Sequence, residues 1–187
     1  MDEPRGLSHP ALSSNRGRRS LAIEIREERS GDLAAIREVN ELAFGQPLEA
    51  NIVDAVRSNG AMLASLVAMV DDRIVGHIMY SPVSLNAVVG AGLGPVAVRP
   101  GDQRHGIGSA LIKTGNAQLQ RAECPFIVVL GHAEFYPRFG FRPASRHGIT
   151  CEWDVPDDAF MVLVLDAARM EGVSGMARYR QEFSAAM

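Results

Sequence analysis

The residues best suited to chemistry lie where a valine-rich run ends in a glycine-containing loop, just before an apolar, helix-like stretch. The loop reads Gln103-Arg104-His105-Gly106-Ile107-Gly108. The first turn of a helix presents backbone N–H groups without intrahelical partners, and the helix dipole adds positive potential there. The two glycines leave room for an anion to approach these donors, and the arginine and histidine supply side chains that can face it. The segment therefore predicts a phosphate or pyrophosphate site.

Two familiar phosphate-binding loops do not fit this segment. A P-loop requires the sequence G-K-[ST], which is absent here. A dinucleotide-binding loop passes almost directly from strand to glycines and carries an acid about 20 residues later. Here the loop is longer, Leu111 stands where the third glycine belongs, and the apolar run 126–130 is followed by Gly131-His132 instead of an acid. A nicotinamide dinucleotide is therefore disfavoured as the ligand.

Two motifs resemble those of a known family. Val98-x-Pro100 followed by the loop resembles the acetyl-CoA signature of the GNAT superfamily of N-acetyltransferases. The sequence Phe135-Tyr136-x-Arg138-Phe139-Gly140-Phe141 resembles that superfamily's second signature, especially in a YhbS-like bacterial subgroup. The specific matches cover residues 93–110 and 131–141, and the order of elements matches over 21–165. The resemblance implies an acetyl-CoA-dependent N-acetyltransferase, with acetyl-CoA as cosubstrate and no metal.

The resemblance also implies where acetyl-CoA binds. Backbone N–H groups of the loop would hold the pyrophosphate, and the backbone of the strand 93–98 would pair with the pantetheine arm and the acetyl carbonyl. For this pairing the strand 93–98 must separate from its neighbour at 126–130. The implied cofactor-binding residues are Val96, Ala97, Val98, Gln103, Arg104, His105, Gly106, Ile107, Gly108, Ser109 and His132.

Tyr136 is the implied catalytic residue. It stands where many family members keep a tyrosine near the CoA sulfur, and a phenol there can donate a proton to the departing thiolate. The alternative is that Tyr136 only packs within a short helix, as we expect for Phe135, Phe139 and Phe141. Arg138 is expected to form an ion pair or to lie near a phosphate.

The proton acceptor stays open at this point. Many relatives carry a carboxylate on the strand that corresponds to 93–98, and this strand has none. Glu49, Glu134, Asp154 and His132 are each compatible with the role, and each is equally compatible with a solvated surface position. The missing strand carboxylate keeps a second function open, a non-catalytic acetyl-CoA-binding regulatory module. No motif identifies the amine acceptor, whose pocket we expect near residues 32–58, 81–92 and 145–158.

The pattern of the remaining chain predicts the elements that position these residues. Its strand and helix signals indicate a mixed α/β sheet, and the resemblance implies a mostly antiparallel central sheet flanked by helices. Residues 90–94, rich in glycine, are interpreted as a break before the strand 93–98. The expected elements are a strand near 21–25, helices within 32–44 and 48–58, a hairpin at 62–70 and 73–81, a strand at 93–98, a helix at 107–122, a strand at 126–130, a short helix at 133–139 and a strand at 159–165.

Composition limits the domain organisation and the partners. The 187 residues suit one domain at 21–166, preceded by a disordered leader at 1–20 and followed by a tail or helix at 167–187. A net charge of −3 argues against nucleic acid or an anionic membrane as the main partner. The strand 159–165 is a candidate edge that could pair two copies in a homodimer.

Cysteine content and apolar runs indicate the compartment. Cys124 and Cys151 form no CxxC pair and no zinc-ligand spacing, so reduced structural thiols are expected. The sequence shows neither an apolar run of membrane-spanning length nor the apolar core of a secretory signal. Together these features predict a cytoplasmic protein.

Overall fold

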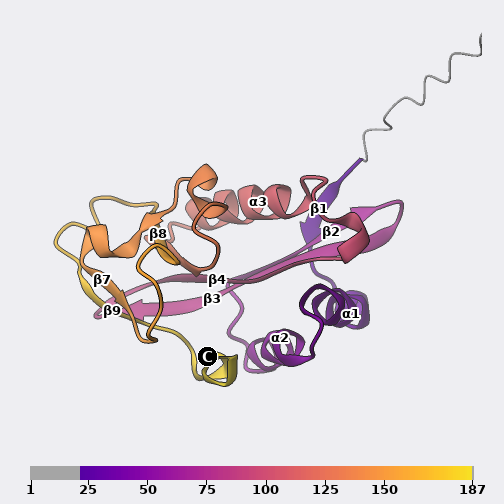
Figure 1. Cartoon of the computed structure of the whole chain (residues 1–187), viewed down its shortest axis with the longest axis horizontal. Helices are drawn as coiled ribbons and strands as arrows, with labels where there is room; N and C mark the ends of the chain where they lie inside the picture. Colours follow the sequence, from indigo (N-terminus) through magenta and orange to yellow (C-terminus); the bar gives the residue numbers. More distant parts are fainter. Residues whose placement is uncertain (1–21, 187) are drawn as a thin grey trace, which may run out of the picture.

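The structure, a computed structural model, describes residues 22–186 and consists of three layers (Figure 1). A twisted sheet forms the middle layer. Helix α3 (Ile107–Arg121) covers one face, and helices α1 (Leu33–Phe44) and α2 (Leu48–Ser58) cover the other. The expected leader at 1–20 lies outside the described residues.

The sheet has nine strands in the order β1-β2-β3-β4-β5-β8-β6, with β9 beside β3 and β7. Neighbouring strands are antiparallel except for the pairs β4–β5 and β7–β9. The predicted mixed, mostly antiparallel sheet flanked by helices is therefore confirmed. The strands are β1 Glu24–Glu27, β2 Ala64–Val70, β3 Arg73–Leu85, β4 Val88–Val98, β5 Phe126–Leu130, β6 Arg142–Pro143, β7 Ile149–Cys151, β8 Phe160–Val164 and β9 Gly175–Arg178.

The glycine-rich stretch 90–94 does not break the chain, so that interpretation is wrong. It lies inside β4, which pairs with β3 along almost its whole length. A Cβ atom on Gly90 would lie 2.6 Å from the carbonyl oxygen of Phe126, and one on Gly92 would lie 2.8 Å from the side chain of Val83. These glycines therefore permit close packing within the sheet.

The end of the chain contributes to the sheet, although its sequence suggested only a tail or helix at 167–187. Strand β9 pairs with β3, and the 3₁₀ helix η5 (Gln181–Ala186) follows it and packs beside α2. Strand β8 was predicted as an edge, which is also wrong, because it pairs with β5 on one side and β6 on the other. The three strands that were not predicted, β6, β7 and β9, are too short for a periodic pattern.

A buried polar chain joins the sheet to the α1–α2 layer. His77 on β3 is fully buried, and its Nδ1 accepts a 3.1 Å hydrogen bond from the amide of Asn40 on α1. Its Nε2 lies 2.9 Å from the hydroxyl of Ser65, which donates to Glu28. Glu28 in turn pairs with Arg57 on α2 through two hydrogen bonds. Burial lowers the pKa of His77 to about 4, so the imidazole is neutral at pH 7.

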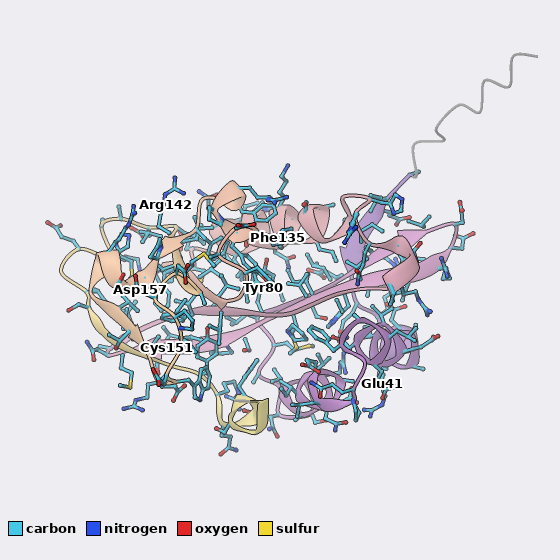
Figure 2. The ribbon with its side chains drawn as sticks, in the orientation of Figure 1. Glu41, Tyr80, Phe135, Arg142, Cys151 and Asp157 are labelled. Atoms are coloured by element: carbon cyan, nitrogen blue, oxygen red, sulfur yellow. The ribbon has the colours of Figure 1, made fainter. Side chains whose placement is uncertain are left out.

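The face under α3 is packed more closely. Tyr80 lies between the sheet and α3 (Figure 2), and its hydroxyl donates a 2.9 Å hydrogen bond to the side chain of Asn116. Gly115 on α3 stands directly against the Tyr80 ring, where an added Cβ would collide with the ring atoms. This contact fixes the distance between α3 and the sheet.

We predict that Gly115→Ala lowers the free energy of unfolding by up to about 2 kcal/mol. Overpacking costs about 1–3 kcal/mol, which exceeds the roughly 1 kcal/mol that alanine gains over glycine in a helix. Urea unfolding would measure the change. Gly108→Ala on the same helix is the matched control, because its Cβ would make only ordinary contacts at 3.7 Å. Equal effects of the two variants would contradict the packing argument.

We predict that stability falls as the pH drops from 6.5 to 4.5. The pKa of His77 is depressed in the folded state, so its contribution to the free energy of unfolding is fully present above pH 6.5. As the pH falls, the imidazole of the unfolded chain gains a proton before the folded one does, and this contribution is lost. The loss attributable to His77 is about 2–3 kcal/mol by pH 4.5, at about 1.4 kcal/mol per pKa unit. Urea unfolding at several pH values measures it, and His77→Gln should show a shallower dependence. A variant with the wild-type slope would assign the effect to other groups.

Candidate active site

The site begins where two neighbouring strands separate. Strands β4 and β5 run parallel and pair at Ala91 with Ile127 and at Gly92 with Val128. Within residues 22–186 this pairing extends no further along β4. Leu93, Val96, Ala97 and Val98 pair with β3 alone, and Gly94 and Pro95 lie at an irregularity in that ladder. The separation that the sequence argument required is therefore present.

The separation leaves backbone groups of β4 facing the gap. The N–H of Arg99 donates to the carbonyl of Val75 on β3, at 2.9 Å. Hydrogen-bonded and non-hydrogen-bonded pairs alternate along an antiparallel ladder. Ala97 therefore bonds to β3 through its pair with His77, whereas the N–H and C=O groups of Val96 and Val98 point away from β3. They face the side from which β5 has departed.

The glycine loop follows β4 and ends at the first turn of α3. Arg104 and Gly106 both have positive φ angles, 64° and 85°, and Gly106 immediately precedes the helix. The side-chain amide of Gln103 donates a 3.1 Å hydrogen bond to the carbonyl of Val98, which ties the loop back to the strand. The loop thereby turns the chain so that the start of α3 lies beside the free edge of β4.

A cavity of about 720 Å³ lies along this edge and the start of α3. Nine of the predicted cofactor-binding residues line it, together with Tyr136. Phe135 and the end of α1 also line it, although the sequence analysis assigned neither to cofactor binding. The nine are Val96, Val98, Gln103, Arg104, Gly106, Ile107, Gly108, Ser109 and His132. Two arginines, Arg104 and Arg138, give the cavity positive charge, and the Arg138 guanidinium stacks 4.7 Å above the Phe135 ring.

Two predicted cofactor-binding residues do not line this cavity. The side chain of Ala97 is fully buried on the opposite face of the sheet, in the core beneath α1 and α2. The exposed ring of His105 turns back onto its own loop, with Nδ1 3.2 Å from the carbonyl of Asp102. Alternation along the strand explains the first position, and the tight turn of the loop explains the second.

A second cavity of about 310 Å³ adjoins the first. It is walled by the start of α2, the β4 segment around Pro95, the end of β5, and the residues that follow β9. Four residues line both cavities, and these mark where the two meet. They are Phe44, Val96, His132 and Tyr136.

Tyr136 is held at this junction by its surroundings. It begins the 3₁₀ helix η3 (Tyr136–Phe139), and its ring makes edge contacts with Phe135 at 5.2 Å and Phe141 at 5.7 Å. Gly131 lies flat against the ring, where any side chain would collide. Burial raises the pKa of Tyr136 to about 12, so the phenol keeps its proton at neutral pH.

The structure separates the four candidate proton acceptors. Glu49 and His132 line the smaller cavity beside Tyr136. Asp154 lies in a different depression next to Trp153, and Glu134 lines neither cavity. Only two of the four therefore line a cavity that Tyr136 also lines.

Three aromatic residues in the cavity walls were missed by the sequence analysis. Phe44 ends α1, and Tyr179 and Phe183 follow β9, so they come from distant parts of the chain. They belong to no motif, and a single aromatic residue after a short strand carries no periodic signal. The loops expected at 81–92 and 145–158 contribute no residue to the smaller cavity.

Residues 22–186 contain neither a membrane-spanning helix nor a cluster of metal-ligating side chains. Across residues 22–186, no helix has the length and apolar character needed to cross a membrane. The same residues contain no group of three or more histidine, cysteine, aspartate or glutamate side chains arranged to hold a metal ion.

Known proteins share this fold and its motifs. The profile of the GNAT acetyltransferase domain matches residues 63–143. The Escherichia coli protein YhbS, an uncharacterised N-acetyltransferase, is 29% identical over 86% of this chain and 98% of its own length. Its crystal structure in complex with CoA matches with a TM-score of 0.83 at 28% identity, over 95% of this chain and 96% of that one.

Two further relatives agree with this assignment. The E. coli protein YjhQ, also an uncharacterised N-acetyltransferase, is 34% identical over 68% of this chain and 74% of its own length. A GNAT acetyltransferase from Brucella melitensis, solved in complex with acetyl-CoA, is 36% identical with a TM-score of 0.73, over 87% of this chain and 98% of that one. This chain, with both signature motifs placed around one pair of cavities, belongs to the GNAT family of N-acetyltransferases.

Proposed function

We propose that this enzyme transfers an acetyl group from acetyl-CoA to a primary amine by direct attack while both substrates are bound. The observation that carries the proposal is the meeting of two cavities at Val96, His132 and Tyr136. One cavity ends at a helix start suited to phosphate, and the other opens beside a carboxylate. The solved relatives, one with CoA and one with acetyl-CoA, support this use of the larger cavity.

In this proposal the larger cavity binds acetyl-CoA. The pyrophosphate lies against the N–H groups at the start of α3, with Arg104 adding positive charge. The pantetheine amides pair with Val96 and Val98 as an added strand would, because these backbone groups face the gap. Ala97 and His105 stay out of direct contact, since one faces the other core and one folds onto its loop.

The chemistry follows from the groups at the junction. The amine nitrogen bonds to the acetyl carbon, the carbon–sulfur bond breaks, and the sulfur leaves as a thiolate. The free backbone N–H groups of β4 stabilise the oxyanion formed during attack. The ammonium group first releases one proton to solvent, and the nitrogen loses a second proton as the amide forms. The Tyr136 phenol gives its proton to the sulfur and is restored by that second proton, so the products are the acetamide, CoA and one proton.

The phenol suits this role because it holds a proton until one is needed. Its pKa of about 12 exceeds the usual value of 10, so it is fully protonated across the neutral range. A developing thiolate next to the ring would draw that proton directly.

We further propose that the enzyme works in the cytoplasm of a bacterium, which the two free cysteines and the bacterial relatives support.

We predict that CoA and acetyl-CoA raise the melting temperature, whereas NADH and ATP do not. A ligand that binds only the folded state adds roughly 2.7 kcal/mol of stability at a hundredfold excess over its dissociation constant. A thermal scan with each ligand checks this. No shift with millimolar CoA would contradict the assignment of the larger cavity.

We predict that Gly108→Asp weakens CoA binding at least about tenfold, or 1.4 kcal/mol, while the fold is retained. The carboxylate would lie at the helix start where the pyrophosphate binds, and the backbone there has room for a Cβ atom. Titration calorimetry measures the affinity. Gly31→Asp is the control, because it adds the same charge in open space away from the cavity. Equal affinity in all three proteins would place the phosphates elsewhere.

We predict that Tyr136→Phe lowers kcat by roughly 10²-fold, within the 10²–10⁴ typical of general acid catalysis. Phenylalanine keeps the packing against Gly131, so CoA affinity should be unchanged. The deficit should shrink at high pH, where a thiolate leaves unaided. Steady-state rates of CoA release over a pH range check this. Full activity at every pH would make Tyr136 a packing residue only.

A further inference from the structure

Glu49 lines the smaller cavity and, unlike the other carboxylates of the α1–α2 layer, has no arginine partner among the described residues. On the α1–α2 layer, the carboxylates of Glu38, Glu41 and Asp54 each form an ion pair with an arginine, at 2.7–2.9 Å. Glu49, in the first turn of α2, forms no ion pair with any residue in the described part of the chain. Its oxygens accept only 3.2 Å hydrogen bonds from the amide of Gln46. This carboxylate is therefore the one in the layer left to bind a cation.

Apart from the imidazole of His132, the rest of the cavity wall is mainly aromatic or aliphatic. Phe44, Tyr136, Tyr179 and Phe183 contribute rings, and the remaining wall is mainly aliphatic or backbone. Among the described residues that line it, no lysine or arginine is found, and Glu49 is the single carboxylate. The two arginines of the site belong to the larger cavity. Charge thus divides the site into a cationic half for an anionic cofactor and a half with one negative charge.

The ring of Tyr179 gives the wall a fixed aromatic surface. It lies between Trp153 and Phe183, at centroid distances of 4.9 and 5.7 Å. Its hydroxyl is buried and has no hydrogen-bond partner within residues 22–186, so the ring and not the hydroxyl faces the cavity. An apolar or aromatic ligand would therefore pack against this ring.

The segment that holds this wall is rigidly attached. The side-chain amide of Asn59 at the end of α2 donates a 2.7 Å hydrogen bond to Glu182, which also pairs with Arg180 at 2.8 Å. The Arg180 hydrogen bond lowers the pKa of Glu182 to about 2, so this carboxylate is ionised at neutral pH. Its negative charge is balanced by the positive charge of Arg180. Phe183 beside it is buried in the core under α2. The wall is therefore preformed.

We propose that the smaller cavity selects a small primary amine with one positive charge on a compact aromatic or apolar body, and that Glu49 binds its ammonium group. The proposal rests on the proposed function and defines its acceptor class. One carboxylate matches one ammonium, which disfavours polyamines and aminoglycosides. The lack of a lysine or arginine in the wall disfavours amines that carry a free carboxylate. A volume of about 310 Å³, at the small end of the roughly 300–1,000 Å³ typical of ligand pockets, suits a small molecule.

An amine panel tests the substrate class. Phenethylamine and tyramine represent the proposed class, and spermidine, kanamycin, free phenylalanine and a lysine-containing peptide represent the alternatives. CoA release measured with the full chain should give a kcat/KM at least about tenfold higher for the first two. A preference for any alternative overturns the inference and leaves the acetyltransferase function intact. CoA binding without acetylation of any amine overturns the proposed function itself.

Variants test the role of Glu49. Glu49→Gln should raise KM for phenethylamine at least about tenfold while KM for acetyl-CoA and the melting shift with CoA stay unchanged. Glu49→Asp should recover part of the loss, because it restores the charge. Glu41→Gln is the control, since Glu41 lies on the outer side of α1 and binds Arg37 (Figure 2). If Glu49→Gln only lowers stability, as loss of an acid from a helix start would, the amine KM stays unchanged and the inference fails.

Discussion

The separation of β4 from β5 is the constraint on which the rest of the site depends. Backbone N–H and C=O groups in a sheet normally satisfy one another, so a strand that loses a neighbour must find another partner or face solvent. Here Val96 and Val98 face the gap, and β5 instead pairs with β8 on its far side. The larger cavity lies on the α3 side of this gap, and the smaller cavity is walled in part by α2. Both cavities therefore exist because one ladder stops after two pairs.

Packing on the two faces of the sheet keeps this gap in place. Under α3, Gly115 fits against Tyr80 and holds the helix start at a fixed height beside β4. Under α1 and α2, the hydrogen-bonded series from Arg57 to Asn40 through His77 fixes the helices that wall the smaller cavity. The contact between Gly115 and Tyr80 is steric, whereas the interactions through His77 are hydrogen bonds. Each positions the elements around one of the two cavities.

Sequence reasoning was most successful where a backbone conformation has few alternatives. The loop from Gln103 to Gly108 needs glycine at a positive φ and a helix directly after it, so its residues alone indicated this turn and the start of α3. Sequence reasoning failed for Gly90 and Gly92, because glycine looks the same whether it breaks a strand or admits a neighbouring side chain. The direction of the Ala97 side chain, toward the core beneath α1 and α2, could not be read from the sequence, since which residues face the gap depends on a register that only pairing defines. Tyr179 had no local signal at all, because its position results from β9 joining the sheet.

The placement of Tyr179 and Phe183 has a consequence for how the protein assembles. The groups around the larger cavity come mostly from one contiguous stretch, whereas the smaller cavity joins the end of α1 to residues after β9. Contacts between distant segments form late, because closing a long loop carries a larger entropy cost. During synthesis the N-terminal elements emerge first. The larger cavity can thus take shape on a nascent chain before the smaller cavity has its last wall, which Tyr179 and Phe183 complete only when the final strand docks.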